Sequence, residues 1–139
     1  MVSLNNTKPK QIPFAQVAIQ LGRSSDETNT GEIAFGGVVS RLYEGELTLI
    51  NNVNPNGFWE VPVDTITQGE EQVLGRSAIL DTRTALILAP GDDIIALFSN
   101  APSAYFDPFN GLLLNCNTTY NLSLTIGGTA FPIHPSDLM

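Results

Sequence analysis

The chain has 139 residues, of which 42% are hydrophobic and 14% charged, and its 14 acidic and 6 basic residues give a net charge of −8. A chain of this length predicts a single domain over residues 1–139 with a core of its own. Nucleic acids and anionic membranes attract clustered positive charge, so the acidic balance argues against both as partners. No apolar run approaches the roughly 20 residues that a membrane-spanning helix needs.

The N-terminal half predicts strands separated by polar or glycine-rich turns. Its first ten residues are polar and contain no apolar stretch, so no signal peptide is expected in this chain. Pro62 falls inside the last predicted strand of this half, which places that proline at a bulge or on a sheet edge. Alternating or short apolar runs predict strands over residues 14–21, 31–35, 44–50 and 58–66.

The C-terminal half predicts further strands and one short helix near residues 91–99. Pro90 suits the start of a helix, and Asp92 and Asp93 favour the positive end of its dipole. Many short strands with one helix predict an all-β fold, either a sandwich or a barrel-like arrangement. Strands are expected over residues 72–74 and 77–80 after a hairpin tip at 68–71, and over residues 112–116, 122–126 and 130–133.

The segment from Ser77 to Pro90 is the most informative one for chemistry. An apolar strand leads into Asp81, and a second apolar strand follows at once, so the carboxylate lies between two runs that are expected to be buried. Such a charge is costly unless it is hydrogen-bonded, and Thr82 and Thr84 are nearby donors. The alternative is an aspartate in a tight turn with no chemical role. On this segment alone both interpretations stay open.

This segment resembles the second active-site loop of pepsin-like aspartic endopeptidases, in which apolar residues precede Asp-Thr-Gly-Thr. Other stretches are similar to further family motifs in the same order, and together they cover the chain from about Ile12. These stretches are Gly-Glu-Ile-Ala-Phe-Gly-Gly (31–37), Tyr-Glu-Gly-Glu-Leu (43–47), Gly-Phe-Trp-Glu-Val (57–61), Asn-Cys-Asn (115–117), Leu-Thr-Ile-Gly-Gly (124–128) and Phe-Pro-Ile-His-Pro-Ser-Asp (131–137).

The resemblance implies a fold and a set of roles. The fold would be most of a fungal-type C-terminal lobe, a single lobe of the double-psi β-barrel type, without the N-terminal lobe and the final C-terminal strands. In the family each lobe gives one aspartate to a dyad that shares a proton and activates a water against a peptide carbonyl. By position Asp81 would be the second-lobe aspartate, Thr82 would brace its loop, and Thr84 would hydrogen-bond Asp81. No metal or organic cofactor is implied, and the substrates would be peptides or proteins.

The sequence departs from the family pattern in three ways. Arg83 occupies the position of the motif glycine, where it adds bulk and a charge that would favour the ionised form of Asp81. No second Asp-Thr-Gly occurs in the chain. The family lobe also continues past Asp137, in a stretch that holds the disulfide partner of the cysteine matched by Cys116. We therefore expect a lobe that is inactive alone and needs a complementary N-terminal lobe or self-association.

Two other functions are compatible with these residues. Two copies could each lend Asp81 to a homodimeric aspartic protease, although two Arg83 side chains would then meet near the axis. Alternatively, the chain could be a non-catalytic binding or interaction protein on a protease-derived scaffold, with a peptide ligand, because fold does not imply function. A lobe that normally has a partner is expected to expose strand edges and apolar surface.

The remaining candidate sites carry weaker signals. Cys116 is either a small buried hydrophobe or half of a disulfide whose partner is absent. Asn5, Asn117 and Asn121 begin Asn-X-Ser/Thr triplets and are candidates for N-glycosylation. By the family resemblance, the protein would be extracellular or vacuolar.

Three further expectations concern single residues or pairs of residues. Trp59 is expected in the core, and His134, with no serine or cysteine motif around it, is expected in a turn or in solvent. The pair Asp92 and Asp93 predicts helix-start acids rather than a metal site.

Overall fold

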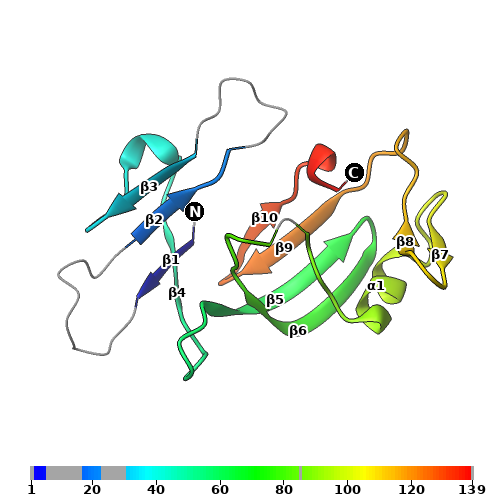
Figure 1. Cartoon of the computed structure of the whole chain (residues 1–139), viewed down its shortest axis with the longest axis horizontal. Helices are drawn as coiled ribbons and strands as arrows, with labels where there is room; N and C mark the ends of the chain where they lie inside the picture. Colours follow the sequence, from blue (N-terminus) through cyan, green and yellow to red (C-terminus); the bar gives the residue numbers. More distant parts are fainter. Residues whose placement is uncertain (1, 6–16, 23–30, 85, 139) are drawn as a thin grey trace. The chain divides into compact units, whose positions relative to one another are not determined.

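The computed structural model of the chain describes residues 2–5, 17–22, 31–84 and 86–138 (Figure 1). The chain divides into two compact units. Unit 1 consists of residues 1–61 and 79–83, and unit 2 consists of residues 62–78 and 84–139. The expectation of one domain over residues 1–139 stays a prediction.

Unit 1 contains two small strand pairs. The strands β1 (Val2–Asn5) and β4 (Thr48–Asn51) are parallel, and β2 (Val17–Gln20) and β3 (Glu32–Phe35) are antiparallel. A short 3-10 helix, Ser40–Leu42, follows β3, and its Arg41 forms an ion pair with Glu32 at the start of that strand. The strand predicted over residues 44–50 is confirmed only in its second half, because β4 begins at Thr48.

Unit 2 is built on a four-stranded sheet with the order β10-β9-β5-β6 (Figure 1). Its strands are β5 (Glu60–Gln68), β6 (Glu71–Ile79), β9 (Leu122–Ile126) and β10 (Thr129–Pro132). Gly69 opens the two-residue turn between β5 and β6 with a φ of 60°, a conformation that glycine adopts without steric cost. The strands predicted separately over residues 72–74 and 77–80 are one continuous strand, β6.

The expectation that Pro62 lies at a bulge or on a sheet edge stays a prediction, and β5 itself lies between β9 and β6 in the sheet. Residues Thr65–Gln68 of this strand pair with β9, whereas Pro62 lies before that paired stretch. The proline therefore occupies a position where the missing N–H does not interrupt the ladder with β9.

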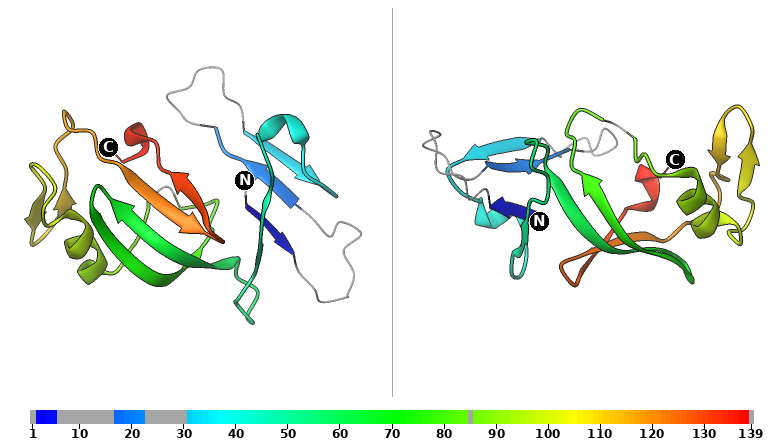
Figure 2. Two further views of the ribbon diagram at one scale, coloured as in Figure 1. Left: turned by 180° about the vertical axis from the view of Figure 1, so that it is seen from behind. Right: turned by 90° about the horizontal axis from the view of Figure 1, so that it is seen from below.

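The core of unit 2 lies where the helix α1 (Gly91–Phe98) meets the sheet. The helix begins directly after Pro90, as the sequence predicts. The rings of Phe98 and Tyr120 pack edge-to-face with their centroids 6.1 Å apart. The hairpin of β7 (Tyr105–Asp107) and β8 (Gly111–Leu113) lies beside α1 (Figure 2). The buried residues of this core are Val73, Leu97, Phe98, Tyr120 and Leu122.

Tyr120 joins two loops through its hydroxyl group. The residue is only 2% exposed, and its hydroxyl donates to the carbonyl oxygen of Pro102 at 2.9 Å. The same hydroxyl accepts a hydrogen bond from the backbone N–H of Asn115 at 3.2 Å. A buried polar group held on both sides in this way fixes the loop positions around the core.

A bidentate ion pair connects β6 to α1. The guanidinium of Arg76 donates through Nε and Nη2 to the two carboxylate oxygens of Asp93, each at 2.7 Å. The side chain of Asp93 is 6% exposed, so this carboxylate has little access to water. The hydrogen bonds from Arg76 hold the pKa of Asp93 below its ordinary value. Asp93 is thus the helix-start acid that the sequence predicts, with a partner that the sequence does not reveal.

The all-β class with one short helix is confirmed, because strands dominate the described residues and α1 is the α-helix among them. The strands described in residues 2–5, 17–22, 31–84 and 86–138 form no closed barrel. The expectation of a buried Trp59 is wrong, since this residue is 43% exposed. In the same part of the chain no helix has the length and apolar character needed to cross a membrane.

The Tyr120 contacts predict the effect of removing one oxygen atom. Tyr120→Phe leaves the carbonyl of Pro102 and the N–H of Asn115 without this partner, so the free energy of unfolding should fall by about 1–3 kcal/mol. Urea denaturation followed by circular dichroism measures this change. Tyr105→Phe, at an exposed tyrosine, is the matched control and should change the stability little. Equal stability of the two variants would contradict the assigned role.

The Arg76–Asp93 pair predicts a pH-dependent contribution to stability. The folded-state pKa of Asp93 lies below the ordinary value of 3.8, so the pair stabilises the fold above that pH. This contribution is lost as the pH falls through the lowered pKa. Arg76→Gln should therefore have a lower melting temperature than the natural sequence at pH 6, and the difference should shrink toward pH 2.

The control for this series is Arg41→Gln, which removes the more exposed pair with Glu32. An exposed pair contributes little, so this variant should melt close to the natural sequence at pH 6. A melting-temperature difference for Arg76→Gln that stays constant down to pH 2 would rule out Asp93 as the titrating group.

Candidate active-site loop

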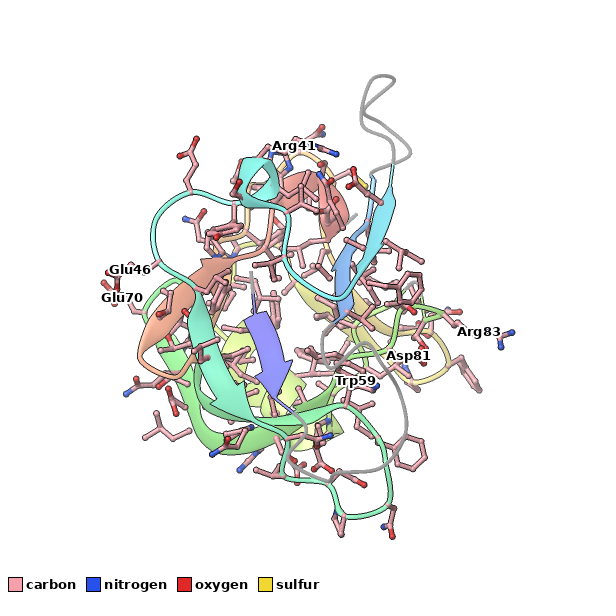
Figure 3. The ribbon with its side chains drawn as sticks, turned by 90° about the vertical axis from the view of Figure 1, so that its left-hand side faces the viewer. Arg41, Glu46, Trp59, Glu70, Asp81 and Arg83 are labelled. Carbon is pink, nitrogen blue, oxygen red and sulfur yellow. The ribbon has the colours of Figure 1, made fainter. Side chains whose placement is uncertain are left out.

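The loop that carries Asp81 begins where β6 ends. The backbone N–H of Leu80 donates to the carbonyl oxygen of Trp59 at 2.8 Å, and the chain then turns. In this turn the Oδ1 atom of Asp81 accepts a hydrogen bond from the backbone N–H of Arg83 at 2.8 Å. The side chain of Asp81, which is labelled in Figure 3, is exposed. The carboxylate is therefore oriented by its own loop and accessible to a ligand.

The bond between Asp81 and Arg83 defines a turn but not a chemical role. The same pattern, in which a side-chain oxygen accepts from the N–H two residues later, occurs at Asp107, where the N–H of Phe109 donates at 2.9 Å. Backbone bonds from Phe109 and Asn110 hold the pKa of Asp107 below its ordinary value. Asparagines repeat the pattern elsewhere in the chain. What distinguishes Asp81 is its place in the family motif.

The side chain of Arg83 extends away from the carboxylate of Asp81 and into solvent (Figure 3). Its backbone contacts Asp81, but its guanidinium forms no ion pair within the part of the chain that the structure describes. The predicted effect of this charge on the ionisation of Asp81 stays a prediction, and the outward direction of the side chain works against a strong effect.

The structure does not decide the roles implied for the two threonines. Thr82 and Thr84 are both exposed. Thr82 belongs to unit 1 with Asp81, and Thr84 is the first residue of the second segment of unit 2. The bracing role of Thr82 and the hydrogen bond from Thr84 to Asp81 stay predictions.

The apolar runs on either side of Asp81 are not buried, contrary to the expectation from the sequence. Ile79 and Leu80 before the loop are exposed, and so are the three apolar residues after it, with Leu88 at 79%. Residues 86–89 also form no strand. The error has a physical reason: an apolar run indicates a buried surface but does not say whether this chain or a partner covers it.

Sequence reasoning did not find that Trp59 adjoins the loop. The hydrogen bond from Leu80 to the Trp59 carbonyl places the two residues on neighbouring backbone segments, one residue before Asp81. Figure 3 shows Trp59 and Asp81 in the same region of unit 1. Because this contact joins residues far apart in the sequence, no local spacing could have predicted it.

Cys116 and the glycosylation candidates lie at the surface where the structure describes them. Cys116 is exposed, so its interpretation as a small buried hydrophobe is wrong, and the disulfide with an absent partner stays a prediction. Asn117 is exposed in a turn, and Asn121 is exposed at the start of β9. The side chain of Asn5 lies outside the described residues. Glycosylation of all three stays a prediction.

His134 makes a local contact with Ser136. Its Nδ1 atom accepts a hydrogen bond from the backbone N–H of Ser136 at 3.3 Å and lies 2.7 Å from the Ser136 hydroxyl. This contact caps the 3-10 helix Pro135–Asp137 and confirms the expected turn position. The described residues contain no group of histidine, cysteine or acidic side chains that could hold a metal ion.

Comparison with known proteins places this chain in a family. Residues 9–139 match the family described as Eukaryotic aspartyl protease. A probable aspartic-type endopeptidase CTSD of Arthroderma otae is 37% identical over 124 residues, which cover 87% of this chain and 32% of that protein. A probable aspartic-type endopeptidase of Trichophyton verrucosum is 31% identical over 158 residues, which cover 100% of this chain and 36% of that protein.

A mammalian relative matches as well. Pepsin A of Canis lupus familiaris is 29% identical over 119 residues, which cover 81% of this chain and 30% of the pepsin. The chain thus spans about a third of the length of the curated relatives that it matches.

The geometry of the loop predicts that Asp81 contributes little to stability. Asp81→Asn keeps a side-chain oxygen that can accept from the Arg83 N–H, so the free energy of unfolding should change by less than about 0.5 kcal/mol. Asp81→Ala, which removes the acceptor, should be the less stable variant of the two. Urea denaturation measures both. A loss above about 1 kcal/mol for Asp81→Asn would instead support a purely structural aspartate.

Proposed function

Because the chain belongs to the eukaryotic aspartyl protease family and is pepsin-like, with fungal relatives, we propose that it forms most of the C-terminal lobe of an aspartic-type endopeptidase. Asp81 would be the aspartate that this lobe contributes. The observation that carries the proposal is the exposed carboxylate of Asp81, oriented by the Arg83 N–H, at the motif position of the family loop.

The chemistry requires a second carboxylate, which a complementary lobe would supply. Two carboxylates a few ångströms apart cannot both ionise readily, so the pair shares one proton. The ionised member accepts a proton from a water molecule while the water oxygen attacks the peptide carbonyl carbon. The protonated member donates its proton to the carbonyl oxygen, and transfer of a proton to the nitrogen then releases the amine. Asp81 alone supplies only one of these two roles.

Exposed apolar side chains support the need for a partner. Monomeric proteins rarely leave large contiguous apolar patches in water, and several large hydrophobic residues of this chain are more than half exposed. They include Phe35 and Leu49 in unit 1, and Leu88 and Phe109 in unit 2. A complementary N-terminal lobe or self-association would cover such surface. The extracellular or vacuolar location implied by the resemblance is part of this proposal.

A second candidate is a non-catalytic protein that binds peptides on the same scaffold. The observation that favours it is Arg83, whose side chain occupies the position at which the family has a glycine. The motif glycine permits close packing of the two active-site loops, and an arginine there adds bulk at that contact. In this candidate the loop would bind a peptide without cleaving it. The homodimeric protease stays a prediction without a structural observation in its favour.

Complementation tests the catalytic proposal directly. The 139-residue chain alone should not cleave denatured protein at any pH between about 2 and 7. After co-refolding with the separately produced N-terminal lobe of the Arthroderma otae relative, it should cleave in a pepstatin-sensitive manner. Asp81→Asn should lower this activity by at least about 10³-fold, because one member of the dyad is lost. Asp92→Asn, at an exposed acid of α1, is the matched control and should retain the activity.

The outcomes separate the candidates. Cleavage by the chain alone, or by the Asp81→Asn mixture, would contradict the assignment of Asp81 as half of a lobe-shared dyad. Cleavage that appears only when Arg83→Gly is also introduced would favour the non-catalytic candidate. No cleavage by either form, with both lobes folded by circular dichroism, would count against the first proposal.

A further inference from the structure

Arg83 differs from the other arginines of the described chain in its electrostatic environment. The described residues contain three arginines and no lysine. Arg41 is paired with Glu32, and Arg76 is held by both oxygens of Asp93. Arg83 has no such partner in the described part, although the chain carries a net charge of −8. It is therefore the guanidinium that remains available to a ligand there.

The backbone fixes where this charge is presented. The N–H of Arg83 donates to Asp81 Oδ1 at 2.8 Å, so the Cα atom of residue 83 has a defined position relative to the candidate catalytic carboxylate. The side chain then leads outward from the loop, away from Asp81 (Figure 3). A ligand group that pairs with the guanidinium would thus lie beside Asp81 rather than on it.

We propose that Arg83 is a specificity-determining residue that selects peptides with an acidic side chain next to the segment bound at Asp81; this inference rests on the proposed peptide-binding function of the loop. A guanidinium matches a carboxylate with two parallel hydrogen bonds, which neutral side chains cannot form. The family glycine has no side chain and cannot make this contact, so the selectivity would be a property of this sequence. Because the chain carries a net charge of −8, the exposed Arg83 gives a local preference rather than a general attraction for acidic peptides.

The expected strength of the preference for an acidic peptide follows from the exposure of the Arg83 side chain to water. Ion pairs that remain in contact with water are weak and are screened by salt. We therefore expect a peptide with aspartate at the selected position to bind about fivefold more tightly than its asparagine counterpart at low salt. The preference should disappear at pH 3, because a peptide aspartate has a reference pKa of about 3.9 and loses its charge below it.

Nuclear magnetic resonance of the ¹⁵N-labelled 139-residue chain provides the test, because it detects weak binding and reports on individual groups. The probes are peptides that differ only in one residue, aspartate, asparagine or lysine, placed at each of four adjacent positions in turn. The expected result at pH 5.5 is a shift of the Arg83 Nε–H signal with one aspartate peptide, together with the tighter binding described above. Arg83→Gln identifies this signal and should abolish the difference between aspartate and asparagine peptides.

Arg41→Gln is the matched control, since it removes a different exposed guanidinium of unit 1 and should leave the preference unchanged. Equal binding of aspartate and asparagine peptides at the Asp81 loop would overturn the role of Arg83 while leaving peptide binding intact. The same follows if the preference survives Arg83→Gln. If no peptide perturbs the backbone signals of residues 80–83, both this inference and peptide recognition by the isolated loop are wrong. The catalytic proposal would not be affected by that result, because it is tested separately by cleavage in the complementation assay.

Discussion

The ion pair between Arg76 and Asp93 constrains the two ends of the stretch of chain that contains the candidate loop. Arg76 lies on β6 and Asp93 in the first turn of α1, so their bidentate contact closes the intervening stretch of chain, in which Asp81 lies. A second contact, from the Asn100 amide to Glu71 at 2.7 Å, joins the start of β6 to the residues just after α1. Breaking a shielded ion pair leaves an uncompensated charge. The two ends of this stretch, at Arg76 and Asp93, therefore cannot move apart without breaking that pair.

The sequence predicted those elements of the fold whose causes are local. Pro90 and the two aspartates that follow Gly91 favour the start of a helix, and α1 begins there. The glycine of the β5–β6 turn and the strand over residues 122–126 likewise follow from short-range patterns. The burial of side chains was predicted poorly, because it depends on which other parts of the protein pack against each side chain. Trp59 and the residues around Leu88 are apolar, but their exposure is decided by tertiary neighbours, or by a partner, that the sequence does not specify.

The candidate site was found from the sequence through the order of its motifs rather than through its chemistry. Asp81 makes a side-chain-to-backbone bond that Asp107 also makes, so local geometry alone would rank the two equally. Only the resemblance of the residues around Asp81 to the family motif distinguishes the two aspartates, and the role of Asp81 stays a proposal. The direction of the Arg83 side chain could not be predicted, because an exposed arginine takes its conformation from nearby carboxylates and solvent. From the sequence, the positive charge of Arg83 was expected to act on Asp81, whereas in the structure the Arg83 side chain points into solvent (Figure 3).

An arginine in the place of a glycine has two opposed consequences, and they act on different surfaces. Toward the second lobe of the proposed enzyme it would add volume where the family loops approach each other, which would disfavour formation of a dyad. Toward a ligand it adds a planar, permanently charged donor beside a carboxylate. The bond from the Arg83 N–H to Asp81 shows that the turn itself does not require glycine at this position. The turn around Asp81 therefore forms with arginine at this position, and the added side chain acts on the approach of a partner loop rather than on the turn.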